Sequence, residues 1–244
     1  MLRKRMADAH NGDAMQLAAT VRRRLSLQRL SIRRDFPMIA LWLLGWLAFA
    51  ALATLAAAFS RFPADLWLAH RLQEIDAVAF VRAVDWAEDL ADTPWGVAIW
   101  LGAVVALAAL AKRWEALLLL VIAVGRLLNA GLKELVERPR PSPDLVLVRD
   151  DPSGFAFPSG HVAGAVFIYG LLFYLATVLI PNPLLRLLAQ AACLYIIAFT
   201  ALERVYVGAH WPSDTVGALL LGGLIVAAFI WVHRHLPAAQ FGTD

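Results

Sequence analysis

The chain has 244 residues, of which 61% are hydrophobic and 17% are charged, and its mean hydropathy is +0.66. Soluble domains average about 45–50% apolar and about 25% charged residues, so the composition excludes an ordinary soluble protein and predicts an integral membrane protein. The single cysteine, Cys193, excludes a disulfide framework and a cysteine-rich metal site. The length suits one domain, and the net charge of +3 conceals a strongly basic N-terminal segment.

That segment, 1–37, carries nine Lys and Arg against three Asp and Glu. A basic segment beside a membrane span sets orientation and contacts anionic lipid headgroups, which we favour over nucleic-acid binding. We therefore expect a cytoplasmic tail. The apolar run that follows, 38–60, is longer than a signal-peptide core and lies far from the N-terminus, so we expect it to be retained.

Six apolar stretches are long enough to cross a hydrocarbon core, which takes about 20 helical residues. They are 38–60, 94–111, 115–135, 161–180, 184–203 and 213–232. The sequence thus predicts an all-α membrane protein, a six-transmembrane-helix bundle in one domain (38–235) with a short cytoplasmic C-terminal tail (236–244). Lys112, Arg113 and Arg186 fall on the same side as the basic N-terminal tail, so both termini are expected in the cytoplasm.

The segment between the first two spans, 61–92, holds seven acidic and three basic residues, as expected of an outer loop. Apolar residues recur in it at steps of three and four: Leu68, Leu72, Ile75, Ala79, Ala83, Trp86 and Leu90. This period predicts an amphipathic interfacial helix that lies on the bilayer surface, and packing against the bundle is the alternative.

Three polar clusters interrupt the apolar spans. They are Lys133–Pro141 (KELVERPRP), Pro158–His161 (PSGH) and Arg204–Asp214 (RVYVGAHWPSD). Counting spans places all three clusters on the outer face of the membrane. One shared site is the simplest explanation of that coincidence.

The PSGH cluster opens a helix, so free backbone N–H groups and the positive end of the helix dipole face an incoming anion. Ser159 can donate its hydroxyl, and Gly160 lets the backbone approach closely. These features predict a phosphate cradle. A serine N-cap followed by an interfacial histidine, His161, would leave the same pattern.

In the first cluster, the RPRP run should end the helix, so that Lys133 and Arg140 can reach one anion. Arg138 also precedes a proline, but its shorter spacing from Lys133 favours a solvated or headgroup-contacting role. Arg126 lies inside the third span, where charges are costly and face the bundle interior. It either contacts a second phosphate, helped by Asn129, or forms a structural pair, which we favour because buried charges are mostly paired.

The third cluster supplies a nucleophile and its orienting group. Arg204 can bind phosphate oxygens in bidentate fashion. Asp214 follows His210 by four positions and can hold one imidazole N–H, which leaves the other ring nitrogen free to attack phosphorus. His161 can then protonate the leaving oxygen.

In order and spacing, the three clusters resemble the signature of the type 2 phosphatidic acid phosphatase superfamily: KxxxxxxRP, PSGH and (S)RxxxxxHxxxD. The superfamily includes polyprenyl-diphosphate phosphatases, glucose-6-phosphatase and vanadium haloperoxidases, and the resemblance covers about 115–232. It implies hydrolysis without metal or cofactor, through a phosphohistidine on His210 that Asp214 orients, with His161 as the acid. The residues that would bind the phosphate are Lys133, Arg140, Ser159, Gly160 and Arg204.

One position departs from the signature, because Glu203 stands where the family has serine. We expect its carboxylate to face away from the phosphate, which it would otherwise repel. The resemblance implies that the substrate is a lipid phosphate or diphosphate at the outer face: undecaprenyl or another polyprenyl diphosphate, phosphatidate or phosphatidylglycerol phosphate.

Two alternatives stay open. The first is a vanadate-dependent haloperoxidase, against which the six spans argue. The second is a non-catalytic transporter or scaffold for anionic lipid, against which the pairing of His210 with Asp214 argues.

Overall fold

The computed structural model describes residues 37–91, 94–150 and 152–235, and every regular element in these ranges is a helix. The predictions for the tails at 1–36 and 236–244 lie outside the described residues. The chain divides into two units, Met1–Leu44 and Gly45–Asp244. The core and the candidate site lie within the unit Gly45–Asp244.

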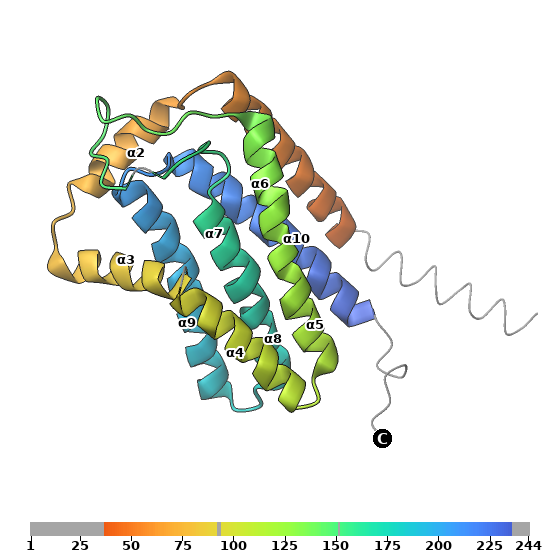
Figure 1. The fold of residues 1–244 in the computed structure, drawn as a ribbon. Coiled ribbons are helices and arrows are strands. Elements are labelled where there is room, and N and C mark those ends of the chain that lie inside the picture. Colours follow the sequence, from red (N-terminus) through yellow and green to blue (C-terminus); the bar gives the residue numbers. More distant parts are fainter. Residues whose placement is uncertain (1–36, 92–93, 151, 236–244) are drawn as a thin grey trace, which may run out of the picture. The chain divides into compact units, whose positions relative to one another are not determined.

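The first described helix, Pro37–Ala58, crosses the boundary between the two units. The elements that follow are α2 (Pro63–Gln73), α3 (Val78–Ala91), α4 (Trp95–Ala109), α5 (Arg113–Val121), η1 (Ile122–Val124), α6 (Gly125–Val136), α7 (Gly160–Ala165), η2 (Val166–Gly170), α8 (Leu171–Leu179), α9 (Pro183–Tyr206) and α10 (Pro212–His235). Figure 1 shows their order along the chain.

Within the described ranges, five helices are long and apolar enough to cross a membrane. They are Pro37–Ala58, Arg113–Val136 (α5 to α6), Gly160–Leu179 (α7 to α8), Pro183–Tyr206 (α9) and Pro212–His235 (α10). They match five of the six predicted spans, so the all-helical membrane fold is confirmed. The predicted span at 94–111 differs, because α4 reaches spanning length only together with α3, to which it is bent by 50°.

The single amphipathic helix predicted within 61–92 is two helices, α2 and α3. The buried residues of α3 are Val84, Ala87 and Ala91, whereas Trp86 of the predicted apolar stripe is 67% exposed. Two hydroxyl groups of α9 donate to α3 backbone carbonyls, Tyr195 to Ala83 at 2.7 Å and Thr200 to Ala87 at 3.4 Å. For α3, therefore, packing against the bundle is the correct alternative.

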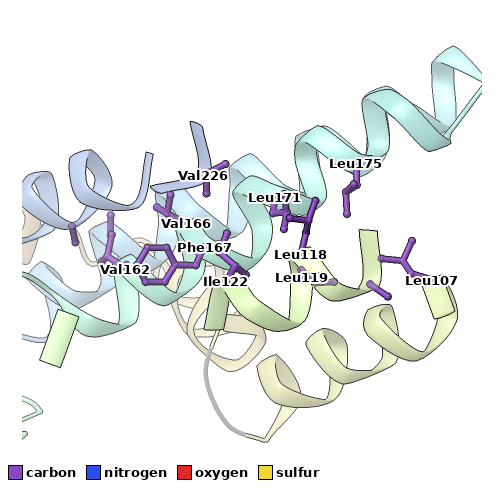
Figure 2. Packing of buried hydrophobic residues seen from close by; sticks show 14 residues of the cluster. Leu107, Leu118, Leu119, Ile122, Val162, Val166, Phe167, Leu171, Leu175 and Val226 are labelled. Carbon is purple, nitrogen blue, oxygen red and sulfur yellow. The ribbon is translucent and has the colours of Figure 1, made fainter. Parts of the chain in front are cut away.

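A buried apolar cluster joins the middle of the bundle. Ile122 of η1, Val162 of α7 and Leu171 of α8 are fully buried in it, and η2, α4, α5, α9 and α10 also contribute to it (Figure 2). Gly222 of α10 lets this helix approach η2 closely, since a Cβ there would lie 2.6 Å from Val166. η2 is a single turn of π-helix, a feature common near functional sites.

Because consecutive spans run in opposite directions, the ends that carry the polar clusters gather at one end of the bundle. The end of α6, the starts of α7 and α10 and the end of α9 all lie there, near α2 (Figure 1). The loop after α6 packs against the loop after α9: Arg149 N–H donates to the Val207 carbonyl at 2.7 Å. Gly208, at a φ of +78°, has no room for a Cβ beside the Leu147 carbonyl.

Candidate active site

His210 lies in the short loop before α10 and is 2% exposed. Its Nδ1 is 3.7 Å from Asp214 Oδ2, and Asp214 sits in the first turn of α10, where the same oxygen accepts from Trp211 N–H at 2.8 Å. Pro212 begins the helix and suits its first position, because no N–H is needed there. The turn thus places a carboxylate beside one imidazole nitrogen, as predicted.

The other imidazole nitrogen faces Arg140. Arg140 Nη1 lies 3.2 Å from His210 Nε2 and 2.8 Å from the Ala209 carbonyl. A guanidinium can only donate, so Nε2 carries the lone pair and Nδ1 carries the proton. Arg140 is itself held by the Gly154 carbonyl, to which its Nε donates at 2.9 Å.

Lys133 projects from the last turn of α6 toward the start of α7. Its Nζ donates to the Phe155 carbonyl at 2.8 Å, and a Cβ built on Gly160 would lie 3.8 Å from Lys133 Cε. Asn129, one turn earlier and buried, reaches the Pro158 carbonyl at 3.5 Å. The first two clusters are therefore in contact, as the sequence predicts.

Ser159 is the N-cap residue of α7, and its backbone N–H donates to the Asp214 carbonyl at 3.2 Å. Within the described ranges, its hydroxyl is buried and has no hydrogen-bond partner. Buried hydroxyl groups are ordinarily hydrogen-bonded, so this one is available to an anion.

Arg204, at the end of α9, is held by carboxylates. Glu203 binds its Nε and, at 2.8 Å, its Nη2; Asp150 lies 3.0 Å from Nη1 and Glu88 lies 2.7 Å from Nη2. Glu203 is thus directed toward Arg204, and the expectation that its carboxylate faces away from the phosphate stays a prediction. The Arg204 guanidinium lies close enough to the Glu203 carboxylate to offset the free energy of burying both charges.

Glu88 of α3 also links Arg204 to His161. Its Oε1 lies 3.9 Å from His161 Nε2 as well as contacting Arg204. Sequence reasoning placed Glu88 only in an acidic outer segment and assigned it no role. The sequence carries little indication of this role, because Glu88 is brought close to Arg204 and His161 only by the packing of α3 on α9.

The sequence suggested that Arg138 is solvated or contacts lipid headgroups, which is wrong, because its exposed fraction is only 1%. Its Nη1 donates to Asp214 Oδ1 at 2.5 Å and its Nη2 to Asp65 Oδ2 at 2.9 Å. The reason is local: Glu137, at a φ of 52°, ends α6 in the left-handed region and turns the chain inward. Asp65 was not singled out from the sequence either.

Arg126 lies at the start of α6, seven residues before Lys133, and beside α7. Its guanidinium carbon would be 3.7 Å from a Cβ on Gly164. The absence of a side chain at Gly164 makes room for the arginine between the two helices.

Burial lowers the pKa of His210 to about 4. Asp214 acts in the opposite direction, whereas the positive charges of Arg140 and Lys133 add to the lowering. His210 is therefore neutral across the physiological range, which is the state that a nitrogen nucleophile requires.

Over the described residues, fold and site together define a class of protein: a helical membrane protein in which a histidine–aspartate pair, basic side chains and a buried serine hydroxyl meet at one end of the spans. Residues 114–237 match the PAP2 superfamily, and the chain belongs to that superfamily.

Two relatives place the chain more closely. It is 38% identical over 120 residues to phosphatidylglycerophosphatase B of Bacillus subtilis, and 30% identical over 141 residues to lipid A 4'-phosphatase of Bacteroides thetaiotaomicron. The alignments cover 47% and 51% of this chain and only 56% and 59% of those proteins.

A solved structure shares the fold. The crystal structure of a transmembrane PAP2-type phosphatidylglycerolphosphate phosphatase from Bacillus subtilis superimposes with a TM-score of 0.69 at 23% identity, over 82% of this chain and 98% of that one. The chain is thus a multi-pass membrane protein with a PAP2 fold.

Proposed function

We propose that this protein is a lipid phosphate phosphatase that works through a phosphohistidine on His210, without a metal ion. The observation that carries the proposal is the orientation of His210, with Nδ1 toward Asp214 and the lone pair of Nε2 toward Arg140. A histidine with a merely structural role needs neither a buried carboxylate on one nitrogen nor a cation on the other.

The substrate phosphate would lie between the basic side chains and the start of α7. Lys133 and Arg140 would bind its oxygens by charge-assisted hydrogen bonds, and the Ser159 hydroxyl and the Gly160 backbone would complete the cradle. Arg204 would join them by exchanging one of its carboxylate partners for a phosphate oxygen.

In the first step, the lone pair of His210 Nε2 attacks phosphorus and a new N–P bond forms. The bond from phosphorus to the lipid oxygen breaks, and His161 donates a proton to that oxygen. The imidazolium that forms donates its Nδ1 proton toward Asp214, whose negative charge stabilises it.

In the second step, His161 takes a proton from water, and the resulting oxygen forms a bond to phosphorus. The N–P bond breaks, inorganic phosphate leaves and His210 returns to the neutral state. Proton and charge are balanced over the cycle, because His161 regains the proton that it gave to the lipid.

We place the substrate among lipid phosphates because the site lies at the ends of membrane spans, where a headgroup can enter while its tails stay in the bilayer. The names of the two relatives favour phosphatidylglycerol phosphate or a lipid A phosphate, and phosphatidate and polyprenyl diphosphate remain in the same chemical class. The basic residues Lys112, Arg113 and Arg186 lie at the opposite span ends, so the site is assigned to the outer face and the termini to the cytoplasm.

The test is inorganic phosphate release by the purified protein in mixed micelles containing phosphatidylglycerol phosphate, phosphatidate, undecaprenyl diphosphate or a soluble sugar phosphate. We expect release from at least one lipid, unaffected by EDTA, and none from His210→Ala. Rapid quenching with radiolabelled substrate should trap an acid-labile phosphoprotein in the wild type only.

The matched control is His235→Ala, which removes a histidine from the last turn of α10, and it should retain full activity. Normal turnover by His210→Ala, loss of activity with EDTA, or phosphate release from the soluble substrate alone would contradict the proposal.

A further inference from the structure

Asp65, Arg138 and Asp214 form a row of alternating charges that is almost completely withdrawn from solvent. Their exposed fractions are 2%, 1% and 0%. The row joins the start of α2, the turn after α6 and the start of α10, three segments that are distant in sequence. Ions buried in this way lose their hydration, and a row of them stabilises a fold no better than well-packed apolar residues.

Ser213 ties the row together at the start of α10. Its N–H donates to Asp65 Oδ1 at 2.9 Å, and its hydroxyl donates to Asp65 Oδ2 at 2.7 Å while accepting from Arg138 Nη1 at 2.7 Å. Asp65 in turn accepts from the Phe62 N–H at 2.8 Å, which fixes it to the first turn of α2. Asp65 is therefore held at both ends of its carboxylate.

The two oxygens of Asp214 have different partners. Oδ1 accepts from Arg138, whereas Oδ2 accepts from the Trp211 N–H and lies nearest to His210. A carboxylate can rotate about its last bond, so Arg138 on Oδ1, together with the Trp211 N–H on Oδ2, fixes which oxygen faces the imidazole. Because Arg138 binds Oδ1, Oδ2 of Asp214 can accept the proton on Nδ1 of His210.

We infer that Arg138 and Asp65 are positioning residues for the reaction: Arg138 orients Asp214 toward His210, and Asp65 orients Arg138. The inference rests on the proposed function and deepens it. Neither residue touches the phosphate or His210; both act through Asp214. The PAP2 match covers residues 114–237 and does not include Asp65. The site of this chain therefore extends into its N-terminal half.

The experiment compares Arg138→Met and Asp65→Asn with the wild type. We expect kcat to fall about 10- to 100-fold in each, as when an orienting partner is removed from a functional side chain, with KM changed less than about threefold. Arg71→Met is the matched control, because Arg71 is an exposed arginine of α2 whose ion pair with Glu74 is exposed as well, and its kinetics should be unchanged.

The discriminating measurement is a double-mutant cycle with Asp214→Asn. If Arg138 acts through the Asp214 carboxylate, Arg138→Met should reduce single-turnover phosphorylation less than about threefold in the Asp214→Asn background. A structural role predicts the full loss in both backgrounds, and that result would overturn the inference.

The acid limb of the kcat/KM profile gives a second readout. His210 faces Asp214, Arg140 and Lys133, and Arg138 reaches it through Asp214. Removing the Arg138 charge leaves the Asp214 charge uncompensated, so the limb should move to higher pH; in Asp65→Asn it should stay or move to lower pH. Equal shifts in the same direction would overturn the inference.

The outcomes separate the two claims. A wild-type protein that releases no phosphate would refute the proposed function. A wild-type protein that is active, with Asp65→Asn indistinguishable from it or with additive losses in the cycle, would refute only the positioning role. Should Arg138→Met fail to fold, Asp65→Asn, which keeps the volume of the side chain, carries the test alone.

Discussion

At the scale of single residues, the chemistry of the site depends on how Asp214 is shared between partners. One oxygen meets Arg138 and the other faces His210, whose second nitrogen meets Arg140. Each ring nitrogen therefore has a neighbour of the sign that suits it. Burial, with Arg140 and Lys133, keeps His210 neutral, and in the proposed reaction Asp214 would stabilise the imidazolium.

The first prediction concerns pH. Because burial lowers the pKa of His210 to about 4, the acid limb of kcat/KM should lie near that pH in the wild type. Asp214 raises the pKa of His210, so Asp214→Asn should move the limb to lower pH and reduce kcat by about 10⁴-fold. Taking the ratio of the two profiles cancels titration of the substrate phosphate, and an unmoved limb would contradict the role of Asp214.

The same pKa has a consequence for stability. The folded-state value lies below the ordinary 6.5, so the unfolded chain binds a proton first as the pH falls. The contribution of His210 to stability is therefore present above about pH 6.5 and is lost on the way down to about pH 4.

The second prediction concerns Glu88, which contacts Arg204 at 2.7 Å and lies 3.9 Å from His161. Glu88→Gln should release Arg204 for phosphate and lower KM about threefold, by weakening one partly buried ion pair. It should also lower kcat about tenfold, because His161 loses the carboxylate that orients it. Steady-state kinetics would show this opposed change, and Asp89→Gln, at an exposed neighbouring position, is the control.

Of the site itself, the residues within the three clusters could be predicted from the sequence, because each cluster is contiguous and its chemistry is local. Asp65, Glu88 and Asp150 could not, since they reach Arg138 and Arg204 only through the packing of α2, α3 and the loop before α7. The difference between Arg138 and Arg140 was also hidden. Two residues apart in one RPRP run, they have different partners: Arg138 meets Asp65 and Asp214, whereas Arg140 meets His210 and the Ala209 carbonyl.

At the scale of elements, the position of α10 determines where Asp214 lies. The helix packs on α7 and η2, and Gly222 allows the closest approach. A long side chain at Gly222 would displace α10 and carry Asp214 away from His210.

The third prediction follows. Gly222→Leu should lower thermal stability by about 1–3 kcal/mol, the usual effect of overpacking, and reduce activity together with it. Gly223→Leu is the matched control, because a Cβ there meets no atom within 4 Å among the described residues, and it should be neutral. Thermal unfolding followed by circular dichroism would decide; equal effects of the two variants would count against this packing.

The helices themselves illustrate which signals survive in a sequence. Uniformly apolar stretches such as α9 and α10 were recognised almost to their ends, because composition and the bounding prolines, Pro183 and Pro212, mark them. The region 61–109 was harder. There, the periodicity suggested one surface helix, whereas α3 uses small residues to pack on α9 and bends into α4.

At the scale of the whole molecule, the loops that bear the site and the loop between α8 and α9 lie at opposite ends of the spans. The fourth prediction is that these ends face opposite sides of the membrane. In a Cys193→Ala background, an impermeant maleimide should label Asp144→Cys in intact cells and Pro181→Cys only after permeabilisation. The reverse pattern would refute the assignment of the site to the outer face.

Asp65 and Glu88 both precede the part of the chain that matches the PAP2 superfamily, yet each forms an ion pair with an arginine inside that part. Exchanging the N-terminal helices for those of a relative is therefore not a neutral graft. A chimera must bring one carboxylate to meet Arg138 and another to meet Arg204. Otherwise each buried guanidinium loses one counter-charge at the transplanted interface, Arg138 keeping only Asp214 and Arg204 keeping only Glu203 and Asp150 among the described carboxylates.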